Sequence, residues 1–144
     1  MDRFIKNTCE VLCPLNEMTA RLRMTRHEFL TPDRKVQRTV FGDGVKAVEV
    51  VINEGNAPYT CNSKLGGRVD LPPYGLLVDS ASFVAFHASN WNGIAYASPP
   101  LFTLRSLDGH PLAKSHKTRV FHGFGSDQIR VGQVIRTVPK EGEF

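Results

Sequence analysis

The spacing of the apolar residues changes near residue 33, and this change constrains the fold more than any other feature. Before it, apolar residues recur every three or four positions between Phe4 and Leu22, which is typical of one face of a helix. After it, short apolar stretches follow one another about every ten residues, separated by Gly, Pro, Asn and Asp. No helical pattern lies between them, which argues against a parallel doubly wound sheet. We therefore predict a mostly β fold: an antiparallel β-sandwich, Ig-like or of the glycosidase C-terminal type, with an N-terminal helical segment.

The N-terminal segment is expected to form two helices. Pro14 interrupts the apolar stripe, and the residue before a proline avoids helical geometry, whereas proline suits the first turn of a new helix. The pattern predicts a helix over 2–12, a kink or break, and a second helix over 14–22. Residues 27–33 are expected as a connector, because Thr31-Pro32-Asp33 is typical of a turn.

The rest of the chain is divided by its turn residues. Gly42-Asp43-Gly44 and Asp108-Gly109 predict hairpins, Gly132-Gln133 predicts a bulge or tight turn, and residues 90–100 predict an irregular loop. The domain organisation expected is a helical leader and connector (1–33), a β-sandwich domain (34–138) and a frayed polar tail (139–144). The predicted strands are 35–41, 45–53, 59–63, 68–71, 76–79, 83–87, 101–107, 117–122 and two that flank Gly132.

Composition bounds the class of protein. The 144 residues suffice for one domain, and 41% hydrophobic with 22% charged residues suits a soluble chain. No apolar run approaches the roughly 20 residues of a membrane span, so no membrane partner is expected. The first residues show no signal peptide, which makes the cytoplasm the default location.

The net charge of +4 is modest. Basic residues gather in three clusters, but no recognition-helix, zinc-finger or RNA-binding pattern accompanies them. We interpret them as solvated surface and expect no nucleic-acid partner; a nucleic-acid binder stays an alternative that requires the clusters to share one face. The clusters are Arg21, Arg23 and Arg26; Arg34, Lys35 and Arg38; and Lys114, Lys117 and Arg119.

Neither thiols nor imidazoles form a metal motif, so no cofactor or metal is expected. Three cysteines, Cys9, Cys13 and Cys61, are an odd number, which does not suit a disulfide framework, and we interpret them as small apolar groups. The five histidines lack a close ligand spacing. An alternative is a small metal-dependent enzyme that uses His87, His116 or His122.

The candidate binding residues lie in the 90–100 loop. Trp91 stands between the amides Asn90 and Asn92, with Tyr96 beyond them and His87 at the end of the preceding apolar strand. A flat aromatic ring can stack on a sugar, and amides can bond its hydroxyls, so these five residues are the predicted carbohydrate contact. The alternative is that Trp91 plugs one end of the sandwich. The carboxylates lie mainly in turns, and no pair is nominated for catalysis.

Two stretches resemble the β-sandwich domain that follows the catalytic barrel in many glycoside hydrolases. The first is Val48-Glu-Val-Val-Ile-Asn53-Glu-Gly55 with Leu71-Pro-Pro-Tyr-Gly75-Leu-Leu-Val78, an apolar strand ending in Asn and Gly and a return strand marked by proline and glycine. The second is Ser106-Leu-Asp108-Gly-His-Pro-Leu112, similar to a hairpin of several such sandwiches. Glu54 stands where that pattern prefers an aromatic residue.

This resemblance implies an accessory domain that is not catalytic by itself, because the catalytic carboxylates of such enzymes lie in the barrel. The implied role is structural, with weak carbohydrate contact. The implied partners are a carbohydrate, a catalytic barrel domain, or a second copy of this chain bound through the N-terminal helix. A stand-alone carbohydrate-binding module is the first alternative, and it would need Trp91 and Tyr96 to be exposed.

Overall fold

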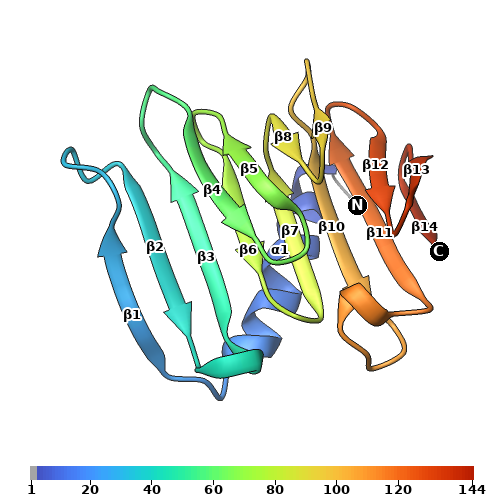
Figure 1. Cartoon of the computed structure of the whole chain (residues 1–144), viewed down its shortest axis with the longest axis horizontal. Helices are drawn as coiled ribbons and strands as arrows, with labels where there is room; N and C mark the ends of the chain where they lie inside the picture. The colour runs from blue at the N-terminus through green and yellow to red at the C-terminus, as the bar shows by residue number, and fades with distance from the viewer. Residues whose placement is uncertain (1–2) are drawn as a thin grey trace.

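The structure is a computed structural model that describes residues 3–144. Its largest element is an antiparallel sheet of eight strands in the order β1-β2-β3-β6-β7-β10-β11-β14 (Figure 1). Strands make up 47% of the chain and helices 14%, which confirms the mostly β prediction. The strands are β1 Met24–Phe29, β2 Val36–Phe41, β3 Val48–Asn53, β6 Leu76–Asp79, β7 Phe83–His87, β10 Leu101–Ser106, β11 Thr118–Phe124 and β14 Glu141–Glu143.

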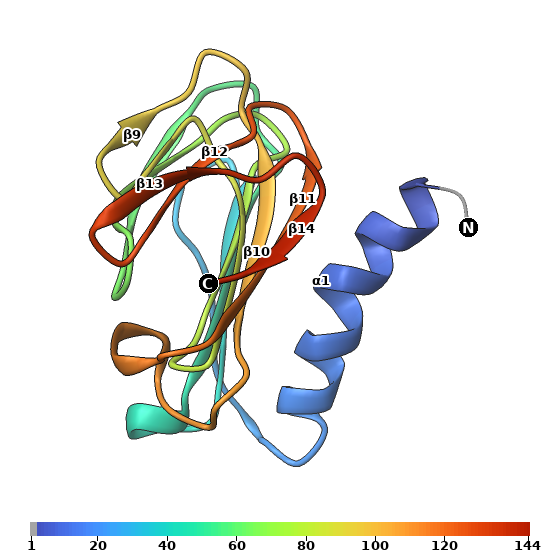
Figure 2. The ribbon, with the colours of Figure 1, turned by 90° about the vertical axis from the view of Figure 1, so that its right-hand side faces the viewer.

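Two smaller sheets cover one face of the large sheet, and a single α-helix covers the other (Figure 2). This arrangement confirms an antiparallel sandwich-like fold with an N-terminal helix. The small sheets are β4-β5-β8-β9 (Tyr59–Ser63, Gly67–Leu71, Asn90–Trp91, Ile94–Ala95) and β12-β13 (Gln128–Val131, Val134–Thr137). The helix is α1 (Arg3–Thr19), and two 3-10 turns are η1 (Gly44–Lys46) and η2 (Leu112–Lys114).

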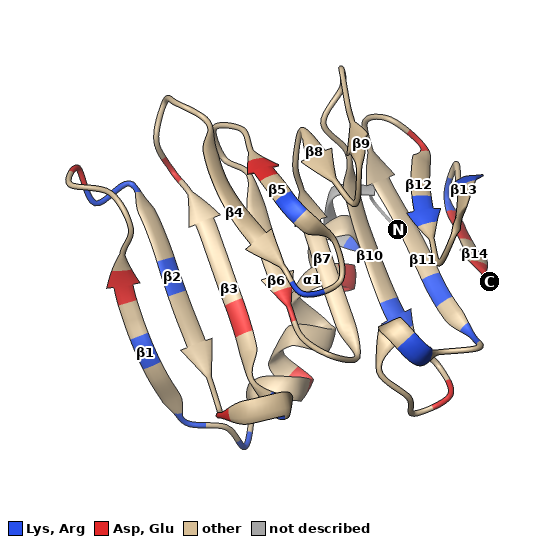
Figure 3. Cartoon of the chain, in the orientation of Figure 1, with Lys and Arg blue, Asp and Glu red and all other residues tan. Residues whose placement is uncertain are grey.

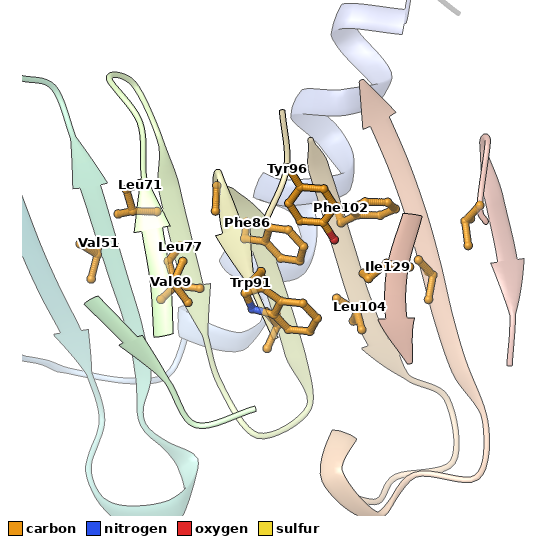
Figure 4. Close-up of a cluster of buried hydrophobic side chains, with 14 of the residues drawn as sticks. Val51, Val69, Leu71, Leu77, Phe86, Trp91, Tyr96, Phe102, Leu104 and Ile129 are labelled. Atoms are coloured by element: carbon orange, nitrogen blue, oxygen red, sulfur yellow. The ribbon is translucent and has the colours of Figure 1, made fainter. Parts of the chain in front are cut away.

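Because both faces of the large sheet are covered, a buried strand contributes side chains to two hydrophobic clusters, one on each face. On β7, Phe86 points into the sandwich, where it joins Trp91 and Phe102 (Figure 4), while Phe83 and Ala85 face the helix. Strands buried on both sides read as continuous apolar runs, which explains residues 83–86. Burying a side chain of this size contributes about 1.5–3 kcal/mol, so the cluster around Phe86 anchors the fold.

The helix runs through Pro14, so of the predicted kink or break the break is wrong, and the two predicted helices are one. A proline cannot donate the bond that the Glu10 carbonyl would accept, which weakens but need not end a helix. Packing on the sheet holds it: Val11 is buried, and Leu15 and Met18 pack against the same cluster. Both carboxylate oxygens of Glu10 also accept from Arg119 of β11, at 2.7 and 2.8 Å. The predicted helix start at residue 2 lies outside the described residues, and the chain leaves the helix at Thr19.

The connector predicted over 27–33 begins instead with part of a strand. β1 pairs with β2 and bonds through the Leu30 N–H to the Val36 carbonyl at 2.8 Å. Its residues are almost all exposed, so no apolar alternation marks it, and backbone pairing holds it in place. Only the turn after it is visible in the sequence: the Arg34 N–H bonds the Thr31 carbonyl at 3.0 Å, as expected for a turn.

The C-terminal tail is not frayed, contrary to the prediction, but forms β14 at the edge of the sheet beside β11. The backbone of Phe144 exchanges two hydrogen bonds with Thr118, at 2.8 and 2.9 Å. The Phe144 ring packs against the sandwich core, and the Arg136 guanidinium lies 4.7 Å from its centre. One aromatic residue therefore fixes a segment whose other residues are polar.

Candidate functional site

The structure places Trp91 in the core. Its side chain is 0% exposed and stacks on Phe86, with ring centres 4.5 Å apart and planes 13° from parallel. Tyr96 is also buried and donates its hydroxyl to the Gln128 carbonyl at 2.7 Å. The two aromatics therefore do not form an exposed platform, and the condition for a stand-alone carbohydrate-binding module is not met by them. The packing of Trp91 agrees instead with the alternative interpretation, in which the indole fills the sandwich.

Trp91 is held there by a tight hairpin in the segment predicted as an irregular loop. Asn92 and Gly93 both have positive φ, 51° and 81°, which is the geometry of a two-residue type I′ turn between β8 and β9. The Asn92 N–H bonds the Gly66 carbonyl at 2.8 Å. A Cβ at Gly66 would lie 2.2 Å from Trp91 Nε1, so the indole needs glycine above it.

His87 and Asn90 lie apart from this packing. His87 Nδ1 is 3.2 Å from the Pro100 carbonyl, and its ring meets Phe124 edge-on at 5.1 Å. Asn90 pairs with Asp70 and Ala95 in the small sheet and borders a shallow hollow beside Gly66 and Gly93. Of the five predicted residues, the structure brings Trp91 and Asn92 together at a cleft and places the other three elsewhere.

That cleft has a volume of about 430 Å³ and lies between β10, η2 and the β12–β13 hairpin. Its size falls within the range of small-molecule sites, roughly 300–1,000 Å³. Apolar and polar side chains both line it. The apolar set is Leu65, Trp91, Leu104, Leu112, Ala113, Val131 and Phe144, and the remainder is Asn92, Ser115, His116, Thr118, Arg130, Gly132, Gln133 and Arg136.

Two arginines among the lining residues, Arg130 of β12 and Arg136 of β13, give the cleft positive charge; both strands carry basic positions in Figure 3. Arg130 is oriented by its Nε, which donates to the Asn92 carbonyl at 3.1 Å. Arg136 is oriented by its stacking over Phe144. The lining residues include no Asp or Glu among those the structure describes, so the two guanidinium groups face a cleft without counter-charge. This arrangement favours oxygen-rich or anionic ligands.

The wall that carries His116 is fixed by one carboxylate. Asp108 accepts from the backbone N–H groups of His116 at 2.7 Å and His110 at 3.1 Å, and from the hydroxyls of Ser106 and Ser115. These donors, the His116 N–H above all, hold the pKa of Asp108 well below its usual value of 3.8. Asp108 thus closes the predicted hairpin loop and shapes the cleft without lining it.

The other buried polar groups are structural. Burial raises the pKa of the Cys61 thiol to about 12, which suppresses its thiolate. Burial also raises the pKa of Asp79, whose carboxylate joins two sheets by accepting from Ser63 Oγ at 2.9 Å and the Lys64 N–H at 3.2 Å. His122 has one ring nitrogen 2.9 Å from the Pro139 carbonyl and the other 3.1 Å from the Gly125 carbonyl.

Within residues 3–144, no three His, Cys, Asp or Glu side chains come together as metal ligands. Over the same residues, no helix has the length and apolar character that crossing a bilayer requires. Comparison with protein-family models gives no match, and comparisons with curated proteins and with solved structures give none either. The sandwich-like fold and the geometry of the cleft are therefore the basis for any functional conclusion.

Sequence reasoning misses most of the cleft. From the sequence, His116 is a candidate only as a metal ligand, and nothing there singles out Arg130, Gln133 and Arg136 together. These residues meet because the β12–β13 hairpin and η2 lie on the same side of the large sheet, opposite α1 (Figure 2). The hairpin register gives no signal either, because Arg130 pairs with Ile135 and Arg136 pairs with Ile129, which places the two arginines on opposite faces of the two-stranded ribbon.

Proposed function

We propose that this chain is a non-catalytic accessory β-sandwich, of the kind that follows the catalytic barrel in glycoside hydrolases, and that it contacts a carbohydrate in the cleft. One observation carries the proposal: the lining of the cleft combines apolar side chains with amide, hydroxyl and guanidinium groups, and its described residues include no carboxylate. Hydrolysis of a glycoside needs two carboxyl groups flanking the bond. The cleft is therefore suited to holding a sugar and not to cleaving it.

The chemistry of the lining supports a sugar as ligand. The two faces of a sugar ring offer C–H surface that packs on apolar side chains, here the partly exposed Leu112 and Phe144. Its hydroxyls both donate and accept, as do the amides of Asn92 and Gln133. The guanidinium groups add donors, so a sugar bearing a carboxylate or sulfate would gain charge-assisted bonds.

The proposal keeps a catalytic barrel as the implied partner. The apolar stripe of α1 already packs on the large sheet of its own chain, so a barrel would dock elsewhere. The alternative of a stand-alone carbohydrate-binding module needs Trp91 and Tyr96 to be exposed, and both side chains are buried. The small metal-dependent enzyme has no candidate site among the described residues.

Isothermal titration calorimetry tests the proposal. Neutral and uronic-acid-containing oligosaccharides are titrated separately into the wild-type protein, and we expect weak binding of at least one class, with a Kd of roughly 0.1–1 mM. Arg136→Gln removes the charge over Phe144 and should weaken binding at least about tenfold, the loss of one charge-assisted contact. Arg68→Gln is the matched control, because Arg68 is exposed on β5 and does not line the cleft.

Two outcomes would contradict the proposal. One is the absence of binding by either class of oligosaccharide up to several times that concentration. The other is an oligosaccharide affinity that is the same in the Arg136→Gln and Arg68→Gln variants, because the ligand would then lie outside the cleft.

A further inference from the structure

We propose that two copies of this chain associate through β1, running antiparallel about a two-fold axis at His27, so that the large sheet continues from one copy into the other. The occupant of this edge is thus a second copy of the same chain. Three features support this pairing: the free edge of β1, the backbone groups that point outward from it, and the order of charges along the strand.

β1 is the long free edge of the sheet. It stands first in the strand order and pairs with β2 on one side; among residues 3–144, no strand covers its other side. The opposite edge, β14, has three residues, half the length of β1. A strand edge carries unpaired N–H and C=O groups that can bond another strand. β1 is therefore the edge at which a further strand can add with the most bonds.

The hydrogen bonds to β2 determine which groups are free. The Leu30 N–H bonds the Val36 carbonyl of the neighbouring strand, and Glu28 stands opposite Arg38 in the same register. Backbone groups alternate in direction along an antiparallel strand. Arg26 and Glu28 therefore direct their N–H and C=O toward β2, whereas those of His27 and Phe29 point to the open side.

This alternation restricts the ways two copies can pair. Among the two-fold antiparallel pairs that bond the outward groups, those that set the charged residues of β1 against one another are centred on Arg26, on His27 or on Glu28. The first choice sets Arg26 against Arg26 of the second copy, and the third sets Glu28 against Glu28. The choice centred on His27 sets Arg26 of each copy against Glu28 of the other. Directly opposed like charges destabilise a strand pair and opposite charges stabilise it, so the charges select His27.

The charged side chains of Arg26 and Glu28 are also accessible to a second copy of the chain. The Arg26 side chain is 61% exposed and lies 4.0 Å from Glu28 of its own strand. Glu28, 39% exposed, contacts Arg38 at 3.0 Å, and Arg38 contacts Glu49 at 2.8 Å. This row of alternating signs runs from β3 to the free edge (Figure 3). Arg26 of the second copy would continue the row at Glu28.

The interface is short. The register shifts between Met24 and Arg26, which leaves Arg26–Phe29 as the regular stretch. A bulge near one end limits how many residues can pair, and small interfaces associate weakly. The proposal therefore predicts a monomer–dimer equilibrium that depends on protein concentration, and not a permanent dimer.

Sedimentation equilibrium of the 144-residue chain tests this, over roughly 10–500 µM, the range suited to a small interface. The wild type should show reversible dimer formation. Arg26→Glu and Glu28→Arg each place like charges in opposition, so each alone should associate at least about tenfold more weakly. An equimolar mixture of the two variants should dimerise again, because in the mixed pair position 26 of each chain faces a position 28 of opposite charge.

Two further variants separate pairing from folding. The double variant R26E/E28R reverses both charges and should dimerise like the mixture. His27→Pro removes an outward N–H that β2 does not use, so it should abolish dimer formation with an unchanged circular dichroism spectrum. Arg68→Glu, a charge reversal on exposed β5, should leave dimer formation unchanged.

Three results would overturn the proposal. The first is a wild-type monomer over the whole concentration range. The second is failure of both the mixture and the double variant to recover dimer formation while their spectra are native. The third is growth beyond the dimer, which would indicate pairing of β1 with the β14 edge of the next copy in place of the two-fold arrangement.

Discussion

At the scale of single residues, the packing of Trp91 decides how the sandwich closes. Its ring lies between Phe86 and the backbone at Gly66. Among the buried side-chain N and O atoms of the described residues, two lack a hydrogen-bond partner: Trp91 Nε1 and Asn7 Oδ1. A buried donor or acceptor that lacks a hydrogen-bond partner costs about 1–3 kcal/mol of stability. The stacking and burial of the indole offset that cost, which is why the position suits packing better than exposed recognition.

Gly66→Ala should therefore destabilise the protein by about 2–4 kcal/mol, because the new methyl group overlaps the indole. Gly67→Ala is the matched control: Gly67 has a positive φ of 66° but nothing within 4 Å of an added Cβ, so it should cost about 1 kcal/mol of backbone strain. Urea unfolding of both variants measures the difference. Equal costs would mean that Trp91 does not lie beneath Gly66.

Asp108 gives stability a definite dependence on pH. Its pKa in the folded protein is lowered by the N–H groups it accepts from, so its contribution is complete above the usual value near 3.8 and is lost as the pH falls toward the lower folded pKa. The difference in unfolding free energy between wild type and Asp108→Asn should be largest at neutral pH and shrink below about pH 4. Urea unfolding at several pH values measures it; a difference that stays constant with pH would contradict this role.

At the scale of elements, the last strand shows how one side chain orders a polar segment. β14 is three residues long, and its exposed glutamates contribute little to the core. Phe144, just beyond it, contacts the core and the Arg136 guanidinium and bonds Thr118 through its backbone. The C-terminal residue therefore fixes the edge of the sheet and one side of the cleft together.

Phe144→Ala should lower the unfolding free energy by about 1–3 kcal/mol, less than the roughly 3–5 kcal/mol of a fully buried phenylalanine because the ring is only partly covered. Glu143→Ala on the same strand should change it by less than about 0.5 kcal/mol. Thermal and urea unfolding compare the two variants. If Phe144→Ala were as mild as Glu143→Ala, the tail would not be part of the folded sheet.

Elements that bury side chains can be predicted from the sequence, and elements held by backbone bonds cannot. The strands from residue 35 to 87 carry apolar residues on a buried face, and their pattern indicates both their positions and the sandwich-like architecture. β1 and β14 lack that pattern, since their positions depend on pairing with a neighbour. The β8–β9 hairpin is a missed signal, because Asn92-Gly93 is a strong two-residue turn.

The candidate site is predictable only in part, for a related reason. Trp91 and Asn92 border the cleft, but their sequence neighbours Asn90 and Tyr96 are directed elsewhere by the hairpin. The remaining lining comes mainly from η2 and the β12–β13 hairpin, which lie much further along the chain. A site assembled from such separated turns depends on how the layers stack, and local spacing does not report that.

At the scale of the whole molecule, three layers share one central sheet. The apolar stripe of the helix covers one face of this sheet, and the small sheets cover the other face around Trp91. The two proposals use different surfaces: the cleft lined by the β12–β13 hairpin, and the open edge of β1, which begins the strand order (Figure 1). They lie at opposite ends of the strand order, so binding in one and association at the other are structurally compatible.

The most direct test of the central claim, that the cleft holds a carbohydrate, uses the single tryptophan as a reporter. Its indole N–H gives one isolated cross-peak in a ¹⁵N–¹H correlation spectrum, and Trp91 lines the cleft. On titration with the oligosaccharide that binds in calorimetry, we predict that this peak and the amide peaks of Gly132, Gln133 and His116 shift together along one saturating curve. Shifts confined to other residues, with these four peaks unmoved, would contradict a carbohydrate site in the cleft.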